Sequence, residues 1–162
     1  MKIILIGFMG SGKSLTAKQL ASRLQLRCYD MDQMVFEQTQ TSNMEELFAR
    51  GGESLLRKME ALIAKTLKTV HNCIIATGGG VVQTPCIMDD LQQGGGIVVY
   101  LDCSFALCAE RAYGKSGRPL FQDLAAAQAL YTLRRSLYLS YANQIVQTDG
   151  KSVELIVQEI VG

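Results

Sequence analysis

Histidine is scarce in this sequence of 162 residues, and its cysteines are not paired in the way metal sites require. His71 is the single histidine, and no CxxC spacing joins the five cysteines. A zinc site needs several well-placed thiolates or imidazoles, and the spacing offers none. We therefore expect reduced, structural cysteines and a reaction that does not use a histidine base.

Long apolar runs are also missing, and the charges nearly cancel. The run that begins at Ile3 ends at Gly7, which is too short for a membrane span or the apolar part of a signal peptide. The net charge of +1 does not indicate a polyanionic partner. We expect a cytoplasmic protein with no nucleic-acid or membrane partner. Without an evident apolar patch, we also expect a monomer.

Strand-like and helix-like segments alternate along the whole chain. Candidate strands span residues 2–6, 27–30, 73–77, 97–101 and 144–148. Helical periodicity covers residues 14–24, 45–67, roughly 85–92, 105–111, 124–141 and 152–161. Continuous Val/Ile/Leu-rich runs are typical of parallel strands that are covered on both faces. The pattern predicts an α/β sandwich with a parallel sheet, in a single domain over residues 1–162.

Two stretches interrupt this alternation. Residues 31–59 are polar and mostly helical where a simple crossover would suffice, and residues 113–123 contain Gly, Ser and Pro without an apolar period. Insertions of this kind on an α/β core often hold substrate. We expect a substrate-binding insertion at about 31–60 and a lid at about 112–124.

The strongest motif is a phosphate-binding loop. Residues 7–14 read GFMGSGKS and match G-x₄-G-K-[ST] in full, with a strand before and a helix after. Its glycines would let backbone N–H groups surround an anion at a helix N-terminus. Lys13 would reach the β- and γ-phosphates, and the Ser14 hydroxyl would hold Mg²⁺. A glycine-rich turn without a ligand is the alternative.

Two carboxylates follow the second strand. Asp30 and Asp32 lie where parallel strands end and ligands bind. One could support Mg²⁺ and the other could draw a proton from an acceptor hydroxyl. The alternative is a solvated helix N-cap at Asp32.

Glycines and arginines complete the candidate acceptor site. Gly78, Gly79 and Gly80 follow the third strand, where bare backbone could approach a ligand. Arginine binds two oxygens of a carboxylate or phosphate at once, and four arginines are candidates for this role. They are Arg57, whose direction Glu60 could fix at i+3, Arg118 in the lid, and the neighbours Arg134 and Arg135.

Taken in order, these motifs resemble the shikimate kinase family, within the superfamily of nucleoside-monophosphate-kinase-like P-loop proteins. The resemblance covers almost the whole chain. Besides the P-loop and the Asp30-x-Asp32 element, the matches are G-E-x₃-R-x₂-E at residues 52–60, the glycine triplet, R-P-L at 118–120, and Arg134-x₃-Tyr138. Ser136, Asn143 and Gln40 depart from the family's usual residues. The spacing to Tyr138 favours Arg134 over Arg135 as the family's arginine.

The resemblance implies a three-layer α/β/α sandwich with strand order 2-3-1-4-5. It also implies transfer of the γ-phosphoryl group of ATP, with Mg²⁺, to the 3-hydroxyl of shikimate in aromatic amino-acid biosynthesis. Carried over by position, the implied catalytic residues are Lys13, Asp32 and Arg118, and the implied metal residues are Ser14 and Asp30. The implied ATP-binding residues are Gly10, Ser11, Gly12, Lys13, Ser14, Leu15, Arg118 and Gln147. The implied shikimate-binding residues are Asp32, Arg57, Gly78, Gly79, Gly80 and Arg134.

Three other functions compete with this one. A gluconate-kinase-like sugar kinase would share the P-loop and a small polyol-acid substrate, but Asp30-x-Asp32 with the glycine triplet argues against it. A nucleoside monophosphate kinase would usually carry more lid arginines and a base-reading pocket, and the sequence indicates no such pocket. A regulatory module without catalysis would lack Lys13, Asp32 or the lid arginine, and all three are present.

Overall fold

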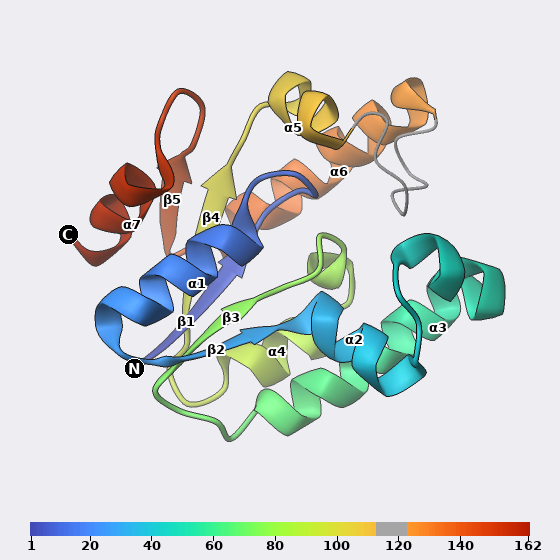
Figure 1. The fold of residues 1–162 in the computed structure, drawn as a ribbon, viewed down its shortest axis with the longest axis horizontal. Helices are drawn as coiled ribbons and strands as arrows, with labels where there is room; N and C mark the ends of the chain where they lie inside the picture. Colours follow the sequence, from blue (N-terminus) through green and yellow to red (C-terminus); the bar gives the residue numbers. More distant parts are fainter. Residues whose placement is uncertain (113–122) are drawn as a thin grey trace.

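Five parallel strands form one sheet at the centre of the protein (Figure 1). The computed structural model describes residues 1–112 and 123–162. The strand order is β2-β3-β1-β4-β5, which confirms the expected fold class. In chain order the strands are β1 (Lys2–Ile6), β2 (Arg27–Asp30), β3 (Cys73–Ala76), β4 (Ile97–Asp102) and β5 (Gln144–Gln147).

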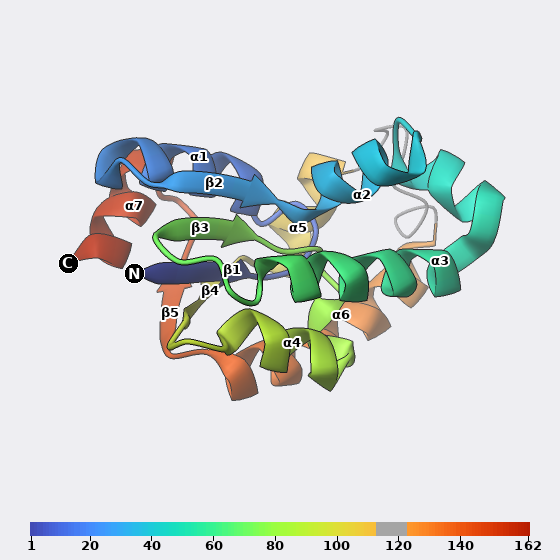
Figure 2. The ribbon, with the colours of Figure 1, turned by 90° about the horizontal axis from the view of Figure 1, so that it is seen from below.

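Helices cover both faces of this sheet and produce three layers (Figure 2). α1 (Lys13–Leu24) and α7 (Val153–Val161) pack on one face, over Ile3 and Leu5 of β1. Ile4 and Ile6 of β1 point to the other face, which is covered by α3 (Met44–Leu67), α4 (Pro85–Gln92) and α6 (Leu124–Tyr141). Because both faces are covered, all of β1 is buried and its sequence is continuously apolar.

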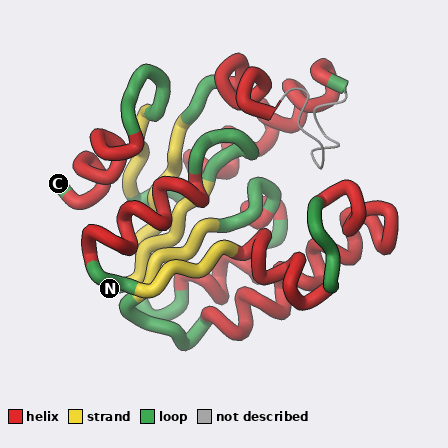
Figure 3. Tube along the Cα trace, in the orientation of Figure 1, coloured by secondary structure: helices red, strands yellow, loops and turns green. Residues whose placement is uncertain are grey.

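The carboxyl ends of the strands bring distant parts of the sequence together. The loop after β1 leads into α1, β2 leads directly into α2 (Met31–Thr39), and the loop after β3 leads into a short 3₁₀ helix, η1 (Val81–Gln83). Figure 3 shows the loops after β1 and β3 at the same edge of the sheet. β4 continues beyond this edge to α5 (Phe105–Ala112). In a parallel sheet this edge is where ligands bind.

The long helical stretch after β2 is divided more sharply than the sequence predicts. α2 and α3 are separate, and α3 begins after Asn43, whose side chain accepts a hydrogen bond from the N–H of Glu46 at 2.8 Å. Within α3, Gly52 has φ 66° and ψ −162°, so the helical path is broken there. The helix expected over residues 45–67 is present as part of α3, and the interruption at Gly52 is a feature that its periodicity does not predict, because glycine adopts such angles at little steric cost.

None of the helices formed by the described residues combines the length and the apolar composition that a membrane span requires.

Candidate active site

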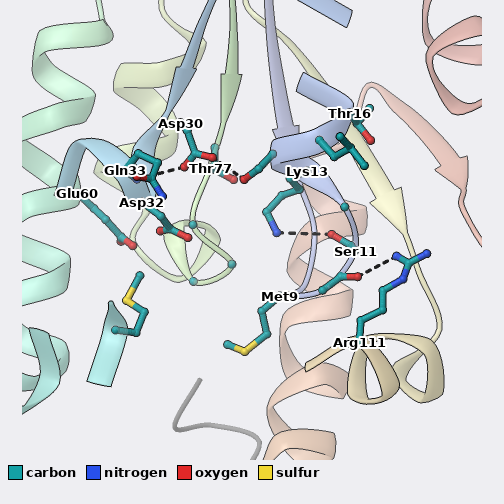
Figure 4. A pocket seen from close by; sticks show the side chains of 18 of the residues that line it. Met9, Ser11, Lys13, Thr16, Asp30, Asp32, Gln33, Glu60, Thr77 and Arg111 are labelled. Carbon is teal, nitrogen blue, oxygen red and sulfur yellow. Dashed lines mark hydrogen bonds between the residues drawn. The ribbon is translucent and has the colours of Figure 1, made fainter. Parts of the chain in front are cut away.

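The loop between β1 and α1 has the conformation that the phosphate-binding motif predicts. Gly7, Gly10 and Gly12 all have positive φ. The Lys13 ammonium group is buried and turns back over the loop, where it donates to the carbonyl oxygens of Gly7 at 2.7 Å and Phe8 at 3.0 Å. Figure 4 shows this lysine beside Ser11 on one side of the pocket. The loop therefore places the Lys13 ammonium group next to the loop backbone at the N-terminus of α1, which is an arrangement suited to binding an anion.

Asp30 joins the end of β2 to this loop. Its Oδ1 accepts from the N–H of Gln33 at 3.2 Å, which makes Asp30 the N-cap of α2. Its Oδ2 accepts from the Ser14 hydroxyl at 2.5 Å. The alternative that Asp32 caps this helix is therefore wrong, because α2 begins directly after β2 and Asp32 lies within its first turn. A carboxylate and a hydroxyl thus meet beside the phosphate loop.

Asp32 and Glu60 converge on the backbone of the glycine triplet. A Cβ at Gly78 would lie 2.8 Å from Glu60 Oε1 and 3.0 Å from Asp32 Oδ1. Figure 4 shows both carboxylates across the pocket from Lys13. Burial raises the pKa of Glu60 to about 7; the neighbouring Arg57 opposes this rise and the charge of Asp32 adds to it. The site therefore contains two close carboxyl groups, one of which titrates near neutral pH.

This buried carboxyl group should make the stability of the protein fall as pH rises. Glu60 has an ordinary pKa of 4.5 and a folded-state pKa of about 7, so its ionisation disfavours the folded state throughout that interval. We therefore expect the free energy of unfolding of the Glu60→Gln variant, measured relative to the wild type, to increase by up to about 3 kcal/mol from about pH 5 to about pH 8. Urea unfolding at both pH values measures this change. A stability difference that does not vary with pH would contradict it.

Arg57 and Arg134 reach the same glycine from two different helices. A Cβ at Gly80 would lie 2.0 Å from Nη2 of Arg57 and 2.8 Å from Nη2 of Arg134. A side chain at this position would displace both guanidinium groups. Arg57 comes from α3 and Arg134 from α6, so the fold brings together two cations that are distant in the sequence. Paired guanidinium groups on bare backbone are suited to binding a carboxylate or phosphate.

The two arginines differ in their surroundings. Arg57 donates to Glu60 at 2.8 and 3.0 Å and to Glu53 at 3.1 Å. Although burial opposes it, these carboxylates raise the pKa of Arg57. Arg134 is only 3% exposed, and burial together with the charge of Arg57 lowers its pKa. Its Nε donates to the amide oxygen of Gln83 at 2.8 Å. Arg134 is thus a buried cation whose side-chain partner is neutral.

Arg135 points elsewhere, although it is adjacent to Arg134. Its guanidinium group donates to Asp102 Oδ2 at 3.1 Å. Asp102 also accepts from the Tyr100 hydroxyl and from the side-chain amide of Gln147, both at 2.9 Å. Asp102 thereby connects α6 to the ends of β4 and β5. The geometry places Arg134, and not Arg135, beside the glycine triplet.

One cavity of about 670 Å³ joins the phosphate loop to the two arginines. Its volume is in the range of small-molecule sites. It is lined by nearly all of the predicted site residues: Gly10, Ser11, Gly12, Lys13, Ser14, Leu15, Asp30, Asp32, Arg57, Gly78, Gly79, Gly80 and Arg134. Gln147 is not among its described lining residues. Arg118 and most of the expected lid lie outside the described residues.

The cavity is also lined by residues that belong to none of the motifs in the sequence. Arg111, at the end of α5, donates to the carbonyl oxygen of Gly10 at 2.9 Å (Figure 4). Lys151, Val153 and Ile156 line the cavity from the segment after β5. The sequence predicts a helix after β4, which is α5. It does not predict how this helix is tilted, and the tilt decides whether α5 approaches the phosphate loop. Gln147, which the family resemblance implies as an ATP-binding residue, ends β5 directly before the segment that contains Lys151 and could have directed attention to it.

Comparison with sequences places this chain among known kinases. Residues 9–162 match the profile of the family described as shikimate kinase. A protein named shikimate kinase from Lactococcus lactis subsp. lactis (strain IL1403) is 39% identical over 162 residues, which cover 99% of this chain and 96% of that protein.

Comparison with solved structures gives the same result. Shikimate kinase from Acinetobacter baumannii in complex with shikimate superposes with a TM-score of 0.92 at 28% identity, covering 99% of this chain and 90% of that one. Shikimate kinase from Aquifex aeolicus superposes with a TM-score of 0.83 at 32% identity, covering 99% of this chain and 94% of the other. The similarity therefore includes the phosphate loop, the inserted helices and the sheet.

Proposed function

The chain belongs to the shikimate kinase family, and we propose that its cavity transfers the γ-phosphoryl group of ATP to the 3-hydroxyl of shikimate. The observation that carries this proposal is the meeting of Arg57 and Arg134 at Gly80 in the cavity that also contains the phosphate loop. Shikimate has one carboxylate and several hydroxyls, so two guanidinium groups and a nearby carboxylate complement its polar groups.

On the nucleotide side, we propose that the phosphate loop binds ATP through Gly10, Ser11, Gly12, Lys13, Ser14 and Leu15. The N-terminal end of α1 and the loop N–H groups favour anionic oxygens. The Lys13 ammonium group would exchange its present carbonyl partners for phosphate oxygens, which are stronger acceptors. The role of Gln147 in ATP binding stays a prediction, since its side-chain amide is bonded to Asp102.

Ser14 and Asp30 fit the proposed binding of Mg²⁺. Mg²⁺ prefers hard oxygen donors and is usually held by one or two carboxylates together with substrate phosphates. The contact between the Ser14 hydroxyl and Asp30 offers two such oxygens next to the phosphate loop. When bound with ATP, the ion would neutralise charge on the phosphate oxygens.

On the acceptor side, Arg57 and Arg134 would bind the shikimate carboxylate and Asp32 would bind its hydroxyls. The backbone of Gly78, Gly79 and Gly80 would lie against the ring. Tyr138 stabilises this backbone, because its hydroxyl donates to the Gly79 carbonyl oxygen at 2.5 Å. The acceptor would therefore be oriented by charge at one end and by Asp32 near the reacting hydroxyl.

In the proposed reaction the 3-hydroxyl oxygen attacks the γ-phosphorus, and the bond to the β–γ bridging oxygen breaks to release ADP. The hydroxyl proton passes to the Asp32 carboxylate. Lys13 stabilises the charge on the transferring group and on the leaving phosphate. From its sequence position, Arg118 would add a second cation when the lid closes and excludes water.

The test is ADP release with Mg-ATP, offering shikimate, gluconate and a panel of nucleoside monophosphates as separate acceptors. ADP release that depends on shikimate alone supports the proposal. Release with gluconate or a nucleoside monophosphate would show that the acceptor side is misassigned. ATP binding without turnover on any acceptor would favour the regulatory module.

The two adjacent arginines should differ strongly in their effect on the acceptor. We expect Arg134→Ala to raise KM for shikimate by the equivalent of about 2–5 kcal/mol, because a buried charge contact is lost. Arg135→Ala is the matched control, since Arg135 pairs with Asp102 and should change KM little. Steady-state kinetics with varied shikimate measures both. A larger KM increase for Arg135→Ala than for Arg134→Ala would show that Arg135, and not Arg134, binds the acceptor.

We propose that the protein acts in the cytoplasm, and that it acts as a monomer because this one chain supplies the described residues of the proposed site. Size-exclusion chromatography with light scattering tests the oligomeric state.

A further inference from the structure

The two guanidinium groups at Gly80 are held by side chains of different charge. Arg57 is bonded to two carboxylates, those of Glu53 and Glu60. Arg134 is bonded through Nε to the neutral amide of Gln83 at 2.8 Å. Among residues 1–112 and 123–162, Arg134 forms no ion pair with a carboxylate. The positive charge of Arg134 is therefore not paired with a carboxylate, whereas the positive charge of Arg57 is paired with two.

Gln83 contacts Arg134 from outside the cavity. It is the last residue of η1, directly after the glycine triplet, and it is not among the described residues that line the cavity. The amide oxygen of Gln83 accepts the hydrogen bond from the Nε–H of Arg134. The two Nη atoms remain on the side of the triplet, where Nη1 would lie 3.6 Å from a Cβ at Gly79 and Nη2 2.8 Å from one at Gly80. The bond thus directs both Nη atoms toward the acceptor site.

An amide can orient a guanidinium group without reducing its charge. A carboxylate at the same position would form an ion pair with Arg134 and would repel an incoming carboxylate. An apolar side chain would leave the charge intact but would let the guanidinium group rotate. Glutamine avoids both effects at a buried cation that otherwise lies over the Phe8 ring, 5.9 Å from its centroid, and is stabilised by the charges of Glu53 and Glu60 without pairing with either.

We propose that Gln83 is a positioning residue for acceptor specificity: it orients Arg134 and keeps its charge available for the substrate carboxylate. This inference rests on the proposed function, because it concerns the same acceptor site. Gln83 contacts Arg134 and not the reacting atoms. It should therefore influence KM for shikimate, and neither kcat nor KM for ATP.

Two substitutions separate orientation from charge. Gln83→Met keeps the length of the side chain and removes the acceptor oxygen, and we expect it to raise KM for shikimate roughly 3- to 10-fold. Gln83→Glu keeps an acceptor and adds a charge, and we expect an increase of roughly 10- to 100-fold. In both variants kcat and KM for ATP should stay within about twofold of the wild type, because the nucleotide side is unchanged.

Controls distinguish this role from damage to the loop. Gln93→Glu adds the same charge at the exposed C-terminal end of α4. This residue precedes the amino end of β4, away from the carboxyl ends of the strands, so KM for shikimate should stay unchanged. In the Arg134→Lys background the Nε–H donor is absent, so Gln83→Met should have no further effect on KM.

The outcomes separate this inference from the proposed function. Normal wild-type turnover with unchanged KM in both Gln83 variants overturns the inference alone. A parallel loss of kcat, or an equal rise of KM for ATP, also overturns it, since either indicates a distorted loop. Absence of shikimate-dependent ADP release by the wild type overturns the proposed function, and this inference with it.

Discussion

Replacing Lys13 with methionine should lower kcat by about 10³-fold, because a preorganised charge at the transferring phosphoryl group is lost. The ammonium group is buried at the start of α1, in the phosphate-binding loop. Methionine has a similar length and no charge, so the helix and the loop should remain. Single-turnover ADP formation with Mg-ATP and saturating shikimate measures the effect directly.

Lys18→Met is the matched control for this prediction. Lys18 lies on the same helix and is exposed, so the same substitution there removes a solvated charge. Its kcat should stay within about twofold of the wild type. Circular dichroism of the Lys13→Met variant checks that the fold is retained. A folded Lys13→Met variant with nearly normal kcat would show that the lysine does not act on the phosphates.

Replacing Asp32 with asparagine should lower kcat by roughly 10²- to 10⁴-fold, because the proposed proton acceptor is removed without a change of shape. Asp32 lies in the first turn of α2 with its carboxylate close to Gly78 and Glu60. The substitution should also lower the pKa of Glu60, since the charge of Asp32 contributes to its rise. The pH profile of kcat for wild type and variant measures both effects.

Glu37→Gln is the control for Asp32, since it neutralises an exposed carboxylate on the same helix. It should leave kcat and KM unchanged. If Asp32→Asn retains kcat within about threefold and raises only KM, then Asp32 binds the acceptor and takes no proton. That result would contradict the proposed proton transfer and keep the acceptor assignment.

The sheet and the phosphate loop could be predicted because both follow from local patterns. A buried strand such as β1 must be continuously apolar when both faces are covered, and the loop needs glycine and lysine at fixed spacing. The strand ends at Asp30 and at the glycine triplet followed from the rule that parallel strands end at one edge. These predictions required no knowledge of contacts between distant helices.

The contacts between elements could not be predicted in the same way. Arg134 and Arg135 are adjacent, and in the sequence only the spacing to Tyr138 favours Arg134; the structure distinguishes them, because the helix directs Arg135 to Asp102. Gln83 carries no motif, and its contact with Arg134 depends on how α6 packs against η1. Arg111 and Gly10 meet for a similar reason. Each of these contacts joins residues that are far apart in the chain.

The N-cap of α2 shows a limit of a different kind. Asp30 and Asp32 are both acceptable cap residues, and a shift of two positions exchanges a capping carboxylate with one in the first turn. Sequence preference does not decide between them. The direct passage from β2 to α2 decides it, because Asp30 retains extended backbone angles and can accept from Gln33.

The break at Gly52 has a consequence for how this protein could diverge. Arg57 and Glu60 lie after the break, on the part of α3 that is anchored in the core by Ile63 and Leu67. Met44 and Phe48 line the cavity from the part before it. Because the helical path is interrupted between them, mutations in the first part can reshape the apolar wall without rotating Arg57, the arginine proposed to bind the acceptor carboxylate. Under the proposed function, the shape and the charge of the acceptor site would therefore be separable targets for selection.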